Sequence, residues 1–266
     1  MFRGTLIRSG NNAKTVKGDG EYETAIMYLA PFTLAGANVC PMAETAGCVA
    51  GCLNTAGRGR MNNVQIARIN KTKRYLNDRI AFMYELVDDL ERFVRYCRRK
   101  GVKPAVRLNG TSDIQWEVAH NTSRGWVSHN INAAGQREEE WGENRGSIFE
   151  LFPEIQFYDY TKVYKRVYRE LPSNYSLVLS YSEANPRYAE AVTKAAHETG
   201  ANMAVVYRAK ELRDYFVDKL AQYGDVCRDV IDGDQTDLRF LDPQRVIVGL
   251  YAKGRAKVDT SGFVVG

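Results

Sequence analysis

Hydrophobic residues after the first hundred positions of this 266-residue chain follow two alternating patterns. Short apolar runs predict strands at Pro104–Leu108, Ile155–Tyr158, Ser176–Ser180, Met203–Tyr207 and Arg245–Tyr251. Between them, apolar residues at helical spacing predict helices over Pro186–Gly200 and Lys210–Tyr223. Strands that alternate with helices are typical of parallel β-α-β units. We therefore expect an α/β fold that forms a parallel (β/α) barrel of the TIM-barrel type, or a partial barrel.

The first hundred residues contribute two strands and then two helices. The strands are predicted at Thr5–Arg8 and Glu23–Tyr28, and the helices at Asn62–Tyr75 and Asp78–Lys100. Gly101 is expected to end the second helix, since glycine commonly follows the last residue of a helix.

The segment Val118–Gly146 is polar and longer than an ordinary connection, so we expect an insertion or flap there. Its histidines, His120 and His129, do not have a spacing typical of zinc sites. The remaining chain gives no sign of a domain boundary, and the prediction is a single domain over residues 1–266.

Composition indicates a globular protein, with 44% hydrophobic and 26% charged residues. No apolar run approaches the length of a membrane span, and the N-terminus lacks the apolar stretch of a signal peptide. The five cysteines are odd in number and three are close together, unlike a secreted disulfide framework. We expect a cytoplasmic protein without a membrane partner.

The strongest candidate site is the loop that contains Cys40, Cys48 and Cys52, with Gly47 and Gly51 between them. Three thiolates in a glycine-containing loop can hold an iron–sulfur cluster, and small residues allow backbone N–H groups to approach its sulfides. The prediction is a 4Fe–4S cluster with one iron left open to a small-molecule ligand. A structural zinc site and three ordinary buried cysteines are the alternatives.

The loop follows the first predicted barrel strand, which places it on the face where barrel active sites lie. This layout resembles that of radical S-adenosylmethionine (SAM) enzymes, although their cysteine spacing is different. The resemblance is one of architecture, and it makes SAM a candidate ligand.

Polar residues follow several other predicted strands and could form a binding site on the same face. The residues expected to bind a cofactor are Asn109, Thr111, Asp113, Glu183 and Asp232. Asp113 and Asp232 are also the protein groups best placed to complete the open iron. Taken singly, each of these residues could instead cap a helix or form a turn.

A stretch without acidic residues begins after Glu44 and ends before Asp78, and it contains the basic segment Arg58–Arg74. Such a segment could bind nucleic acid, with Tyr75 available for stacking. The alternative is a solvated helix face.

Several blocks occur in an order that resembles a tailed-bacteriophage family of gene-product-88-like proteins. They are the cysteine loop, Arg107–Asp113, Phe157–Lys162, Val230–Asp234, Asp237–Asp242 and Val246–Leu250. The resemblance implies a phage protein that works in the host bacterial cytoplasm and carries a cysteine-bound cluster. It implies no settled activity.

The prediction for function is therefore an iron–sulfur protein of unassigned activity. One alternative is a radical-SAM-like enzyme that acts on a small molecule or nucleic acid. A second is a redox-responsive protein that binds nucleic acid or a host protein.

Overall fold

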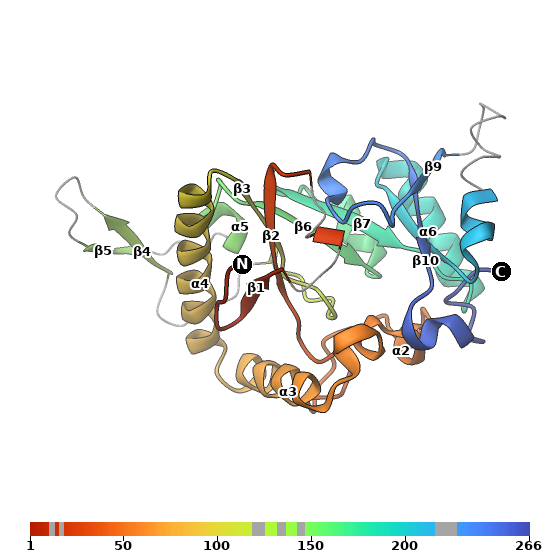
Figure 1. The fold of residues 1–266 in the computed structure, drawn as a ribbon, viewed down its shortest axis with the longest axis horizontal. Coiled ribbons are helices and arrows are strands. Elements are labelled where there is room, and N and C mark those ends of the chain that lie inside the picture. Colours follow the sequence, from red (N-terminus) through yellow and green to blue (C-terminus); the bar gives the residue numbers. More distant parts are fainter. Residues whose placement is uncertain (11–13, 16–18, 119–125, 132–136, 143–146, 216–227) are drawn as a thin grey trace.

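The chain folds around one large, mostly parallel sheet (Figure 1). The computed structural model describes residues 1–10, 14–15, 19–118, 126–131, 137–142, 147–215 and 228–266. The strands are β1 (Ile7–Ser9), β2 (Tyr22–Met27), β3 (Lys103–Arg107), β6 (Gln156–Thr161), β7 (Tyr175–Ser180), β8 (Met203–Tyr207), β9 (Val230–Asp232) and β10 (Ile247–Tyr251). The main helices are α3 (Asn62–Asn77), α4 (Arg79–Lys100) and α6 (Pro186–Thr199). The mixed α/β fold is thus confirmed.

The strand order is β1-β2-β3-β6-β7-β8-β10-β9, and the pairing is parallel except between β1 and β2. The sheet is open within the described residues, with β1 and β9 at its two edges. The prediction of a closed barrel is therefore wrong. β10 pairs with β8 on one side and with β9 on the other. The strands therefore do not follow one another in the sequential order that they would have around a barrel.

Short helical elements lie between the strands and after the last one. They are α2 (Cys48–Gly51), α5 (Ile148–Leu151), and the 3₁₀ helices η1 (Leu53–Thr55), η2 (Gly57–Arg60), η3 (Tyr164–Tyr168), η4 (Arg239–Leu241) and η5 (Gly254–Val258). Within the expected insertion at 118–146, β4 (Trp126–Ile131) and β5 (Arg137–Gly142) form a separate antiparallel pair. The rest of that segment, from 119 to 125, 132 to 136 and 143 to 146, lies outside the described residues, as does Cys227. The single-domain organisation stays a prediction.

Helix α4 supplies the largest part of the core. Asp78 caps its start by accepting the N–H of Ala81, and Gly101 ends the helix as predicted, in the left-handed conformation. Its buried stripe (Phe82, Met83, Leu86, Leu90, Phe93 and Cys97) faces β1, β2 and β3. No helix in the described part of the chain is long and apolar enough to cross a bilayer.

The side chain of Asp89 anchors the N-terminal segment to α4. Although Asp89 is fully buried, its carboxylate accepts the backbone N–H groups of Thr5, Leu6 and Ile7 at 3.0, 2.6 and 3.1 Å. A carboxylate that accepts several backbone hydrogen bonds is a strong link between two elements.

The change Asp89→Ala is expected to lower the free energy of unfolding by about 3 kcal/mol, because it leaves buried N–H groups without an acceptor. Urea unfolding followed by circular dichroism measures the effect. Asp88→Ala, at the exposed neighbouring position, is the matched control and should change stability by less than about 0.5 kcal/mol. Equal effects of the two variants would contradict the anchoring role.

Candidate functional site at the carboxyl ends of the strands

The loop after β3 is organised by Asn109, one of the predicted cofactor-binding residues. Its Oδ1 accepts hydrogen bonds from the Ser112 hydroxyl, the Ile114 N–H and the Trp116 indole. Its Nδ2 donates to the Ile114 carbonyl and to the Asp159 carboxylate. The amide is therefore fully used within the protein, and it shapes the loop.

Asp113 connects this loop to two other parts of the chain. Its backbone N–H donates to Val39 in the cysteine loop at 2.9 Å. Its carboxylate accepts the Thr161 hydroxyl, the Lys162 N–H and the Arg166 guanidinium, each at 2.8 Å. The side chain of Asp113 is buried, so every one of these bonds replaces water.

Arg166 lies at the centre of the same network and is completely buried. It forms a bidentate pair with Glu117 at 2.8 and 2.7 Å and also donates to the Tyr175 hydroxyl. Bidentate pairing satisfies the guanidinium geometry and reduces the cost of burying it.

The cysteine loop lies over this network. The Cys40 thiol donates to the Thr111 carbonyl at 3.8 Å and accepts the Phe32 N–H at 3.4 Å. The Cys52 sulfur accepts the Asn54 N–H at 3.5 Å. Burial raises the pKa of Cys40 to about 12 and raises that of Cys52 as well. Both groups are therefore thiols at neutral pH.

The prediction of an iron–sulfur cluster is wrong. Among the described residues, which include Cys40, Cys48 and Cys52, no group of three or more His, Cys, Asp or Glu side chains is placed to hold a metal ion. The three cysteines are free, and the sulfurs of Cys40 and Cys52 contact backbone groups. The predicted open iron site depended on this cluster and loses its basis. The same holds for the radical-SAM-like enzymatic role and the redox role, which depended on that iron.

The other predicted cofactor-binding residues are only partly brought together. The Thr111 hydroxyl donates to the Leu29 carbonyl and is therefore used within the protein. Glu183 is exposed at the turn after β7. Asp232 ends the edge strand β9 and pairs with Arg213 at 2.9 Å. Binding of a small molecule such as SAM by these residues stays a prediction.

One buried ion pair and one part-buried lysine contact were not foreseen from sequence. Arg107, at the end of β3, pairs with Asp237 at 2.8 Å across 130 residues of sequence. Lys162, at the end of β6, donates to the Ser180 hydroxyl at 3.0 Å and lies over the Phe263 ring. The polar blocks that contain Arg107 and Asp237 were visible in the sequence, but their pairing was not.

The basic segment Arg58–Arg74 divides into buried and exposed cations. Arg68 is buried, bonds to Asn54 and lies 4.7 Å from the centre of the Tyr28 ring. Lys71 donates to the Leu6 carbonyl at 2.6 Å, and burial lowers its pKa to about 8. Arg58, Arg60, Lys73 and Arg74 are exposed, and Arg74 pairs with Glu85.

The C-terminal segment adds two cations beside this region. Element η5 packs on α2 and η1: the Arg255 N–H donates to the Thr55 hydroxyl at 3.4 Å, and the Ser261 hydroxyl donates to the Gly47 carbonyl at 2.8 Å. Figure 1 shows the blue C-terminal segment beside α2. Arg255 and Lys257 are both exposed.

A family model described as Gene product 88 matches residues 5–265, nearly the whole chain. This confirms the resemblance to gene-product-88-like proteins. No curated protein and no solved structure matches significantly, so a likeness to radical SAM enzymes is not shown.

Asp159 should make stability depend on pH. Burial raises the pKa of its carboxyl to about 7, whereas an unfolded aspartate has a pKa of about 4. The folded protein therefore retains a proton that the unfolded chain releases. This contribution to stability is complete below about pH 4 and is lost as the pH rises through about 7.

Urea unfolding at about pH 5 and about pH 8 tests this, with about 1.4 kcal/mol expected for each unit of pKa difference that the pH change spans. Asp159→Asn should flatten the pH dependence relative to the unmodified protein. Asp229→Asn, at an exposed position, is the control. An unchanged pH dependence in Asp159→Asn would show that this carboxyl does not titrate in the expected range.

Cys40 should be a poor nucleophile in the folded protein. Iodoacetamide reacts with thiolates, and a pKa of about 12 leaves roughly one thiolate in ten thousand at pH 8. Alkylation of Cys40 is expected to be about a thousandfold slower in native protein than in urea-unfolded protein. Peptide mass spectrometry over a time course measures it, and equal rates in the two states would refute the expectation.

Proposed function

The chain belongs to the gene product 88 family, and we propose that it binds nucleic acid through phosphate contacts on one basic face. We define the basic face as the exposed cations Arg58, Arg60, Arg255 and Lys257. The observation that supports the proposal is that folding brings these cations together from two segments far apart in sequence. Neither segment, 45–77 or 250–258, contains an acidic residue.

The two halves of the basic face are fixed relative to one another. A Cβ atom on Gly254 would lie 2.9 Å from Cα of Ala56, so η5 is packed directly on the residues that precede η2. Because Gly254 also has a positive φ of 58°, the turn favours glycine. The approach of the two backbones thus holds Arg255 near the segment that contains Arg58 and Arg60.

The apolar side chains around the basic face favour backbone recognition over base stacking. Val49, Leu53, Met61 and Val258 are exposed by 41%, 52%, 49% and 77%. Stacking on single-stranded bases relies on aromatic rings, and these side chains are aliphatic. Tyr75, the stacking candidate predicted from sequence, is buried against Phe82 and Trp116. The proposed ligand is therefore duplex DNA, bound without sequence preference.

An acidic host protein is the second candidate partner. The exposed aliphatic residues favour it, because large exposed apolar side chains beside charged ones are typical of protein interaction surfaces. Duplex DNA is the first candidate because cations without acidic neighbours match the regular charge of a phosphate backbone.

Binding to a duplex oligonucleotide should weaken steeply with salt. Four phosphate contacts predict a slope of about −3.6 in a plot of log affinity against log salt concentration. The double variant Arg58→Ala/Arg60→Ala should reduce the slope to about −1.8. Fluorescence anisotropy across a salt series measures both values.

The double variant Arg187→Ala/Lys194→Ala removes two exposed cations from α6 and is the control for net charge. It should leave the slope unchanged. Absence of binding at low salt, or an equal change in the control, would reject the basic face as a nucleic-acid site. Salt-sensitive capture of an acidic protein by the same face, without DNA binding, would favour the second candidate.

A further inference from the structure

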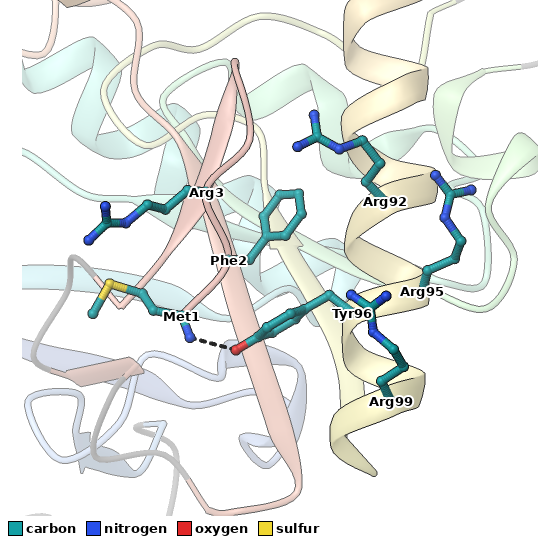
Figure 2. Close-up of a pocket in the computed structure, with 7 residues that line it drawn as sticks. All are labelled: Met1, Phe2, Arg3, Arg92, Arg95, Tyr96 and Arg99. Carbon is teal, nitrogen blue, oxygen red and sulfur yellow. Dashed lines mark hydrogen bonds between the residues drawn. The ribbon is translucent and has the colours of Figure 1, made fainter.

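Four arginines surround a hollow between the N-terminal segment and α4 (Figure 2). The hollow has a volume of about 360 Å³ and is lined by Met1, Phe2, Arg3, Arg92, Arg95, Tyr96 and Arg99. We call it the arginine pocket. It shares no residue with the basic face, and it lies on different elements of the fold.

The spacing of residues on α4 creates one wall of the pocket. Arg92, Arg95 and Arg99 are separated by three and four positions, so they project from the same side of the helix. Figure 2 shows their side chains along successive turns, with Arg3 on the N-terminal segment across from them and its side chain extending away from α4 in this view. Arg98, between two of them in sequence, does not line the pocket.

The opposite wall is held in place by buried groups. A Cβ atom on Gly4 would lie within 2.7 Å of three Asp89 carboxyl atoms, so the segment that carries Arg3 is pressed against α4. Phe2 is buried, with its ring 5.2 Å from that of Phe93 and 5.8 Å from that of Tyr96. The backbones that carry the four arginines are therefore fixed before any ligand binds.

The acidic residues nearby do not balance the charge of the pocket. Arg92 lies 3.5 Å from Asp88 and 3.4 Å from Asp89, and Arg95 lies 3.4 Å from Glu91. These contacts are long for charge-assisted hydrogen bonds, and the Asp89 carboxylate already accepts three backbone N–H groups. In the described part of the chain, Arg3 and Arg99 form no ion pair.

Helix electrostatics explain only part of this arrangement. Cations in the last turn of a helix are favoured by its dipole, which accounts for Arg99. The dipole does not account for Arg3, which comes from another segment, or for Arg92, which lies two turns earlier. Like charges repel when they face one shared space, so an arrangement of this kind is stabilised by a bound anion.

We propose that the arginine pocket binds adjacent phosphate groups. Guanidinium groups present paired donors that match phosphate oxygens, and several of them around one hollow suit a ligand with more than one phosphate. Two sources share this chemistry: a free diphosphate, such as that of a nucleoside diphosphate, and consecutive phosphodiesters of a nucleic-acid strand.

Titration calorimetry of the full chain with inorganic pyrophosphate, at low salt, tests the proposal. Arg99→Ala and Arg3→Ala should each weaken binding about tenfold, which corresponds to about 1.4 kcal/mol. Arg98→Ala is the matched control and should leave the affinity unchanged. Arg99→Lys, which retains the charge, should weaken binding less than Arg99→Ala.

A parallel titration with a duplex oligonucleotide distinguishes the two sources. Loss of pyrophosphate affinity in Arg99→Ala assigns the pocket to a free diphosphate, while loss confined to the oligonucleotide assigns it to a nucleic-acid strand. The variant Arg187→Ala/Lys194→Ala, which lies in neither proposed site, should not change pyrophosphate binding. The pocket uses no residue of the basic face, so failure of the basic face would leave this result intact. The proposal is overturned if neither titration responds to Arg99→Ala, or if Arg98→Ala has the same effect.

Discussion

The buried carboxylate of Asp113 is the constraint on which the candidate site depends. It ties the end of β6 to the loop after β3 through Thr161 and Arg166, and its own N–H holds the cysteine loop through Val39. A buried charge is costly unless its hydrogen-bonding capacity is satisfied, so these partners cannot be exchanged for water. Hydrogen bonds from the loop after β3 therefore hold the cysteine loop, and the described residues contain no metal-binding group that could do so.

The strands and helices could be predicted because their signals are local. The stripe on α4 and the glycine that ends it are encoded within a few residues of each other, and β8 was predicted with the bounds Met203–Tyr207 that the structure has. Closure of a barrel is not local, since it requires pairing between the first and last strands. The insertion of β10 between β8 and β9 cannot be predicted from periodicity, and for this reason the sequence did not decide between a closed and a partial barrel.

The candidate site shows the same division between local and distant information. Asn109, Thr111 and Asp113 were expected in one site because they follow one strand, and all three lie in the loop after β3. Some of their side-chain partners come from distant parts of the chain, such as Asp159 for Asn109 and Arg166 for Asp113, and periodicity gave no sign of these contacts. Spacing alone made the cysteines look like metal ligands. Whether a cysteine is a metal ligand or a buried thiol depends on what surrounds its sulfur. For Cys40, burial favours a neutral thiol that contacts the backbone.

Basic residues of similar appearance in the sequence have different physical roles in the folded chain. The side chains of Arg68 and Lys71 are desolvated on folding and donate hydrogen bonds to groups inside the protein. They therefore stabilise the attachment of α3. The exposed arginines kept their charge available to solvent. A cation whose backbone is already fixed loses less conformational freedom when it binds an anion than one on a free loop. Asp89 fixes the N-terminal segment, one side of the arginine pocket, against α4 through hydrogen bonds that are themselves buried. The buried carboxylate of Asp89 thus helps to position the positive charge of the arginine pocket at the surface. This connects the stability of the fold to its capacity to bind anions.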